Sequence, residues 1–163
     1  MTKWNIDQSW YDRISGKSCK LCDELKHGEE TSMGLVVSEM RVCRWILAKN
    51  QYIRGYSILV LAEHRIELFE LDRETRHQFM DDISDVTRIL SDTLSPIKIN
   101  VEMQGNVVPH LHCHVKPRFA ADTPGHARIF QGAGNVILPA AELSTMRDEF
   151  RERMSGNPED KCG

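Results

Sequence analysis

Three histidines alternate with apolar residues in the segment His-Leu-His-Cys-His-Val at residues 110–115. The histidines are His110, His112 and His114. Successive side chains of a β-strand point to opposite faces, so on a strand the three imidazoles share one face and the apolar side chains point into the core. Because a strand rises about 3.3 Å per residue, neighbouring imidazoles lie about 6 to 7 Å apart, near enough to share one substrate phosphate.

Imidazole suits chemistry at phosphorus because its ordinary pKa lies near neutrality, so a neutral nucleophile and a protonated acid can coexist in one site. A neutral ring nitrogen can attack phosphorus and form a P–N bond that water later breaks, which replaces one difficult step by two easier ones. A neighbouring histidine can protonate the leaving atom. The basic residues Lys116 and Arg118 follow directly and can stabilise phosphate charge. The alternative is that both are ordinary solvated charges.

A second pattern, Cys19-Lys20-Leu21-Cys22, supplies half of a tetrahedral zinc site. The chain has 5 cysteines, and its first ten residues lack the apolar segment of a secretion signal. Both observations favour reduced thiols over a disulfide framework. Three interpretations of the pair stay open at this point: a zinc site, a reduced pair without a shared role, and a redox dithiol.

Short runs of apolar and β-branched residues predict the strands that position these side chains. These runs cover residues 35–38, 42–47 and 57–62, and polar or glycine-containing stretches separate them. We interpret the runs as neighbouring antiparallel strands. Alternation over residues 97–103 predicts a further strand. A turn at residues 104–106 then leads into a strand over residues 107–116, which carries the histidines.

Two segments have the spacing of a helical face. Asp72 is a predicted N-cap, and the helix after it ends before Pro96. Its apolar stripe consists of Phe79, Ile83, Val86 and Leu90. A second helix is predicted at about residues 139–154, with Leu143, Met146 and Phe150 on one stripe. This order of elements predicts an α+β fold, with an antiparallel sheet of about five strands, a long helix and a C-terminal helix.

The length, net charge and apolar content of the chain limit the possible functions further. A chain of 163 residues suits a single domain, here with a core at about residues 17–120 and a C-terminal extension at about 139–154. The net charge of -3 offers no polycationic surface, so we expect no nucleic acid polymer as a partner. No stretch approaches the roughly 18 apolar residues of a membrane helix. We therefore expect a cytoplasmic protein that does not interact with membranes.

Residues 110–118, His-Leu-His-Cys-His-Val-Lys-Pro-Arg, resemble the signature of the histidine triad (HIT) superfamily. The strand at residues 58–64, which ends in His64, also resembles that family. The resemblance implies that His112 is the nucleophile and that His114 stabilises or protonates the leaving group. It also implies that His64 and His110 complete a structural zinc site with the two cysteines, and that the protein is a homodimer.

The sequence departs from the family pattern at three positions that bear on substrate binding. Ala48 stands where many members carry an acidic residue or asparagine for the ribose, and the nearby Asn50 is a candidate substitute. Tyr56 follows Gly55 where the family has histidine. Asn106 replaces a glutamine or serine and can hydrogen-bond a phosphate oxygen, although asparagine is also a common turn former.

The leading hypothesis is a nucleotide hydrolase that cleaves a dinucleoside polyphosphate or a nucleoside phosphoramidate through a nucleotidyl-histidine intermediate. One alternative is a nucleotidyltransferase or phosphorylase, in which a group other than water takes the nucleotide from His112. The other is a nucleotide-binding protein with little turnover, which the changed positions Ala48, Tyr56 and Asn106 favour.

Overall fold

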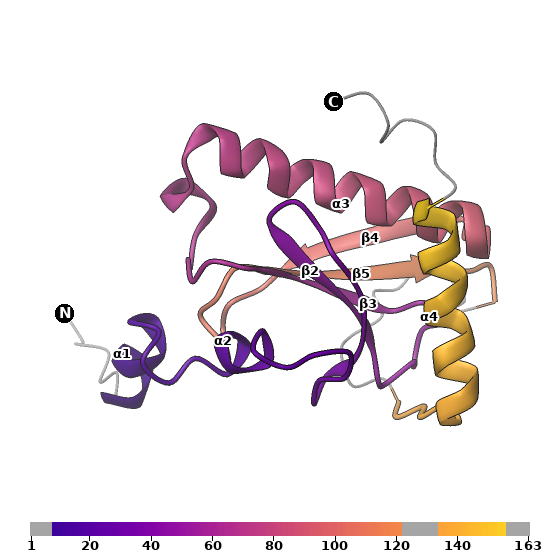
Figure 1. The fold of residues 1–163 in the computed structure, drawn as a ribbon, viewed down its shortest axis with the longest axis horizontal. Helices are drawn as coiled ribbons and strands as arrows, with labels where there is room; N and C mark the ends of the chain where they lie inside the picture. Colours follow the sequence, from indigo (N-terminus) through magenta and orange to yellow (C-terminus); the bar gives the residue numbers. More distant parts are fainter. Residues whose placement is uncertain (1–7, 122–133, 156–163) are drawn as a thin grey trace.

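The computed structural model describes residues 8–121 and 134–155 and has the predicted α+β fold (Figure 1). The strands are β1 (Gly34–Glu39), β2 (Cys43–Ala48), β3 (Ser57–Leu61), β4 (Lys98–Met103) and β5 (His112–Arg118). They form one antiparallel five-stranded sheet in the order β1-β2-β3-β5-β4. The helices are α1 (Gln8–Ile14), α2 (Lys20–Glu24), α3 (Arg73–Leu94) and α4 (Ala140–Ser155), and a 3-10 turn, η1, spans Leu68–Glu70.

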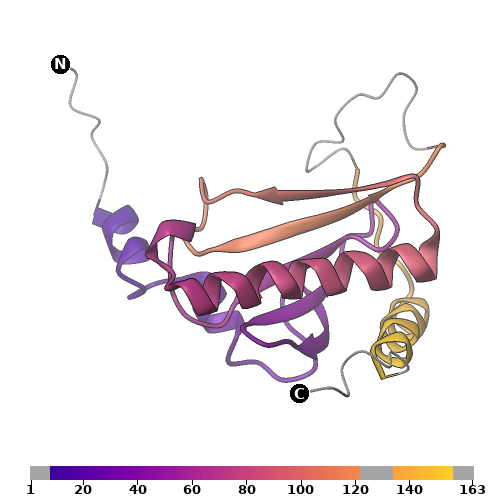
Figure 2. The ribbon, with the colours of Figure 1, turned by 90° about the horizontal axis from the view of Figure 1, so that it is seen from above.

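The two faces of the sheet carry separate apolar clusters. The larger cluster lies under α3 and α4 and includes Leu111, Cys113 and Val115, the apolar residues between and after the histidines. Helix α3 runs along the sheet while α4 packs against β1 and α3, at the end of the molecule away from α1 (Figure 2). The smaller cluster lies on the other face, where Leu21 of α2 packs against β2 and β3. The triad strand therefore has one face in the core, as its alternation predicts.

Helix α3 has the predicted start and end. The Asp72 carboxylate accepts a hydrogen bond from the backbone N–H of Thr75 at 2.9 Å, which satisfies a donor of the first turn. The helix ends at Leu94, and Ser95 follows in a left-handed conformation before Pro96. None of the described helices is long and apolar enough to span a membrane.

The predicted start of the triad strand at residue 107 is wrong, because β5 begins at His112. Pro109 has no N–H to give to a neighbouring strand. The N–H groups of the next two residues go to loop carbonyls, since His110 donates to Val108 and Leu111 donates to Arg65. Residues 104–111 therefore form a loop at the end of the sheet, and His110 lies just outside the strand.

Helix α4 covers a β-bulge in the edge strand β1. The register of β1 against β2 shifts between Val36 and Ser38. The guanidinium of Arg151 donates to the carbonyl oxygens of Val36 and Val37, at 2.8 and 2.7 Å. The C-terminal helix thus covers part of this sheet edge.

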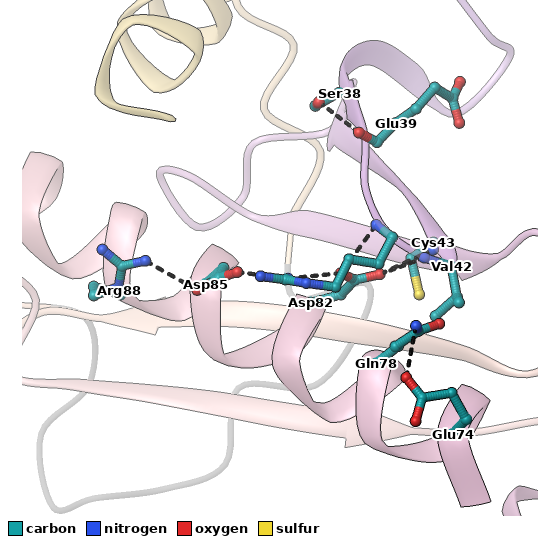
Figure 3. A network of polar contacts seen from close by, with 10 residues as sticks. Ser38, Glu39, Val42, Cys43, Glu74, Gln78, Asp82, Asp85 and Arg88 are labelled. Atoms are coloured by element: carbon teal, nitrogen blue, oxygen red, sulfur yellow. Dashed lines mark hydrogen bonds and ion pairs between the residues drawn. The ribbon is translucent and has the colours of Figure 1, made fainter. Parts of the chain in front are cut away.

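A buried carboxylate joins α3 to the hairpin between β1 and β2 (Figure 3). Asp82 is fully buried and accepts hydrogen bonds from the backbone N–H groups of Arg41, Val42 and Cys43, at 3.1, 3.0 and 3.0 Å. The Arg41 guanidinium contacts the same carboxylate at 3.2 Å and Asp85 at 2.7 Å. Asp82 therefore satisfies donors that would otherwise be left without partners at the hairpin.

We expect Asp82→Ala to lower the free energy of unfolding by about 3 kcal/mol, because it leaves three backbone N–H groups of the hairpin without their acceptor and removes one of the two carboxylates that pair with Arg41. Chemical denaturation measures this change. The neighbouring Asp81 is exposed, so Asp81→Ala should change stability by less than about 0.5 kcal/mol. Equal effects of the two variants would contradict the role given to Asp82.

Candidate active site and metal cluster

Two cysteines and two histidines converge between α2 and the loop before β5. Cys19 Sγ lies 3.3 Å from Nδ1 of His110, and Cys22 Sγ lies 3.3 Å from Nδ1 of His64. The two Nδ1 atoms are 3.3 Å apart, and all four ligand atoms lie within 4.8 Å of one another. A tetrahedral zinc ion with ordinary bond lengths separates two imidazole nitrogens by about 3.3 Å. The cluster is therefore compact enough for one metal ion.

Backbone carbonyls orient both imidazoles of this cluster. Nε2 of His64 contacts the carbonyl oxygen of Ile14 at 2.8 Å, and Nε2 of His110 contacts that of Leu61 at 2.8 Å. A carbonyl oxygen can only accept, so each Nε2 carries the proton and each Nδ1 presents a lone pair to the cluster. Outer hydrogen bonds of this kind orient histidine ligands in metal sites.

The Cys22 thiol is poorly suited to redox exchange. Burial, followed by the contact with Cys19, raises the pKa of Cys22 to about 11. Thiol–disulfide exchange proceeds through a thiolate, and reactive dithiols have lowered pKa values. Of the three interpretations of the cysteine pair, the metal site agrees best with this geometry.

His112 presents one ring nitrogen to a pocket on the face of the sheet against which α2 packs. Its Nδ1 donates to the His110 carbonyl oxygen at 2.5 Å, which leaves the lone pair on Nε2. Burial lowers the pKa of His112, and the hydrogen bond to His110 opposes this effect. A neutral imidazole with a bare Nε2 is the form that can attack an electrophile.

His114 lies beside His112 and is held by a tyrosine. The ring centroids of the two histidines are 4.9 Å apart, in an edge-to-face arrangement. The Tyr56 hydroxyl lies 2.7 Å from Nδ1 of His114. Burial, together with His112 and Lys116, lowers the pKa of His114 to about 4.

The pocket in front of the two histidines has a volume of about 430 Å³. Its apolar lining includes Leu21, Met33, Tyr52 and Ile58, from α2, the β2–β3 connection and nearby segments. Pockets of this size accommodate small organic ligands. The two remaining described histidines, His27 and His77, are exposed and do not line it.

A comparison with protein families matches residues 30–121 to the HIT domain. The chain belongs to the HIT family. The matched segment contains both catalytic candidates, whereas Cys19, Cys22 and α4 lie outside it. HIT membership supports a function in binding nucleotides and in their hydrolysis or transfer.

Solved structures of HIT proteins share the fold of this chain. A histidine triad protein from Sinorhizobium meliloti is 23% identical, with a TM-score of 0.70, over 83% of this chain and 97% of that one. A histidine triad protein from Marinobacter aquaeolei is 21% identical, with a TM-score of 0.69, over 76% of this chain and 90% of that one. A zinc-bound histidine triad protein from Mycobacterium smegmatis is 19% identical, with a TM-score of 0.62, over 86% and 99%. A comparison with curated proteins found no match.

The structure divides the predicted substrate-binding residues into two groups. Asn50 and Asn106 line the pocket. The side chain of Asn50, however, also binds the chain after the triad, because it donates to the Gly134 carbonyl at 3.2 Å and accepts from Val136 N–H at 2.9 Å. Asn50 therefore anchors residues 134–138 beside the pocket.

Lys116 and Arg118 do not line the pocket. Lys116 lies on the histidine face of β5, where it is 2% exposed and pairs with Glu102 at 2.7 Å. It is therefore not an ordinary solvated charge. A direct contact of Lys116 or Arg118 with substrate stays a prediction.

Sequence reasoning assigned no role to Lys20, Tyr52 or the Tyr56 hydroxyl, although all three residues line the pocket. Lys20 lies between the two cysteines, and the CxxC pattern predicts a role only for the cysteines. The sequence shows only that Tyr56 stands where the family pattern has histidine, and it gives no sign of a role for the hydroxyl. Its contact with His114 depends on the pairing of β3 with β5, which aligns Ile58 with His114.

Proposed function

We propose that this protein is a nucleotide hydrolase that cleaves a nucleoside phosphoanhydride or phosphoramidate through a nucleotidyl-histidine intermediate. The observation that carries the proposal is the orientation of His112. Its Nδ1–H is committed to the His110 carbonyl, and the lone pair on Nε2 is left for the pocket that His114 also lines.

The chemistry follows from these two rings. Nε2 of His112 attacks the phosphorus of the nucleotide, a P–N bond forms, and the bond to the leaving group breaks with its electron pair going to the leaving atom. The His110 carbonyl then accepts from Nδ1–H of a positively charged ring. In the second step water attacks phosphorus, the P–N bond breaks, and a nucleoside monophosphate and a proton are released.

Replacing His112 by alanine should lower turnover by roughly 10³-fold or more, because the covalent route is lost. A panel of adenosine and guanosine polyphosphates and phosphoramidates provides the substrates, and intact-mass spectra detect the nucleotidyl adduct in the parent protein. The adduct should be absent from His112→Ala. His77→Ala, which changes an exposed histidine on α3, should keep turnover and adduct. Near parental turnover in His112→Ala would rule out the covalent mechanism.

We also propose that the cluster of Cys19, Cys22, His64 and His110 binds a structural zinc ion. Two thiolates and two imidazoles are a usual donor set for zinc, and all four positions of a tetrahedron are then filled by protein. The zinc-bound relative from Mycobacterium smegmatis supports the assignment. Such an ion would join the N-terminal segment to the sheet beside the pocket.

We expect about one zinc ion per chain in the purified protein, as measured by elemental analysis. Removal of zinc should lower the melting temperature by roughly 10 °C, since a closed site contributes several kcal/mol to folding. Cys22→Ser should lower the zinc content, whereas Ser18→Ala, at an exposed neighbouring position, should keep it. Full zinc content in Cys22→Ser would remove the assignment.

We further propose a homodimer that joins two sheets through β4. Strand β4 is an edge of the sheet, and its outer side has no strand partner among the described residues. Val101 and Met103 on this strand are 38% and 44% exposed. An exposed apolar edge strand is a favourable surface for pairing with a second copy.

Sedimentation at micromolar concentration should give twice the chain mass of 18.7 kDa. Val101→Lys should shift the protein toward the monomer, because it places a charge on the proposed interface. Tyr11→Lys replaces an apolar residue of similar exposure on α1 and should leave the dimer intact. A parent protein that sediments as a monomer at micromolar concentration would exclude the proposed homodimer.

A further inference from the structure

His112 and His114 differ in the group that forms a hydrogen bond with Nδ1. Nδ1 of His112 meets a carbonyl oxygen at 2.5 Å, and Nδ1 of His114 meets the Tyr56 hydroxyl at 2.7 Å. A carbonyl oxygen can only accept, whereas a hydroxyl can also donate. The two neighbouring rings can therefore present different groups to one pocket: a lone pair on Nε2 of His112 and an N–H on Nε2 of His114.

The position of Tyr56 is fixed by the turn before β3. Tyr56 is 4% exposed, and the amide of Gln51 donates to its carbonyl oxygen at 3.0 Å and to that of Ala48 at 2.6 Å. Gly55 has a φ of 80°, and a Cβ there would lie 2.3 Å from a side-chain atom of Leu94. Gln51 thus holds the backbone of Tyr56, and glycine at position 55 lets the turn approach Leu94. The ring of Tyr56 stacks on His114, with centroids 6.0 Å apart.

The charges around His114 favour its neutral form. Burial has the largest effect on its pKa, His112 and Lys116 lower the pKa further, and Glu102 opposes them. Lys116 and Glu102 are paired with each other at 2.7 Å. A neutral ring has one N–H. If that proton lay on Nδ1, both histidines would turn bare nitrogens toward an anionic phosphate, so a bound phosphate favours the proton on Nε2.

We propose that the Tyr56 hydroxyl donates to Nδ1 of His114 and thereby holds this histidine as a neutral ring whose Nε2–H binds the leaving oxygen. Tyr56 is then a positioning residue, because it acts through His114. The inference rests on the proposed function and narrows its substrate class. A neutral N–H stabilises an oxygen that departs as an anion with the electron pair of the broken P–O bond, and it transfers no proton. The site favours phosphoanhydrides, because the amine of a phosphoramidate needs a proton to leave.

Imidazole ¹⁵N NMR of the zinc-loaded full chain tests the role of Tyr56 without any nucleotide. The signals of His114 are assigned by their loss in His114→Asn. In the parent protein we expect the proton on Nε2 and a bare Nδ1, and in Tyr56→Phe a mixture of the two tautomers. Tyr52→Phe removes a neighbouring hydroxyl that has no hydrogen-bond partner among the described residues, so it should leave the His114 tautomer unchanged. A parent His114 protonated on Nδ1, or no change in Tyr56→Phe, would overturn the assignment.

Kinetics test the consequence for substrates. Tyr56→Phe should lower kcat about tenfold with little change in KM, because the lost hydrogen bond acts on the transition state. The parent protein should cleave a dinucleoside polyphosphate faster than a phosphoramidate of the same nucleoside. Faster cleavage of the phosphoramidate would overturn the substrate assignment. Absence of turnover with both substrates would instead refute the proposed function, and the NMR result would still decide the role of Tyr56.

Discussion

The side-chain alternation of β5 is the constraint on which the candidate site depends. Cys113 and Val115 have no exposed surface and pack in the core under α3 and α4, while His112 and His114 face the pocket. A shift of the strand by one residue would bury the imidazoles in the apolar core and expose the core residues. Because the apolar side chains of one face must be buried, the positions of the two imidazoles on the other face are fixed as well. Pairing with β3 and β4 on both sides adds backbone hydrogen bonds to the same register.

His110 connects the metal cluster to the candidate nucleophile. Its Nδ1 belongs to the cluster, its Nε2 donates to the Leu61 carbonyl, and its own carbonyl accepts from His112. The same residue thus contributes a ligand atom and sets which nitrogen of His112 is bare. Anything that holds the His110 backbone in place also holds the tautomer of His112. A metal ion bound at the cluster would therefore affect the proposed reaction through the position of His110, without a direct part in the chemistry.

Features set by local spacing could be predicted from the sequence, and features set by distant contacts could not. The N-cap at Asp72 and the shared face of His112 and His114 follow from short-range rules, and the structure has both. The late start of β5 depends on a carbonyl of Arg65, more than forty residues away in the chain. The anchoring of residues 134–138 by Asn50 is equally remote. Residue type alone likewise could not reveal that Lys116 is buried in an ion pair with Glu102.

The lining of the pocket bears on how a nucleotide would be held. Among its described lining residues there is no carboxylate, and Ala48, the position at which the family resemblance implies an acidic group or asparagine for the ribose, also lines it. The amide of Asn50 is already used on both its oxygen and its nitrogen by the backbone of Gly134 and Val136. Tyr52 and the aliphatic side chains offer apolar contact with a base but few hydrogen bonds to a sugar. Selectivity at this site would therefore rest more on the phosphate and the leaving group, which the two histidines face, than on the ribose.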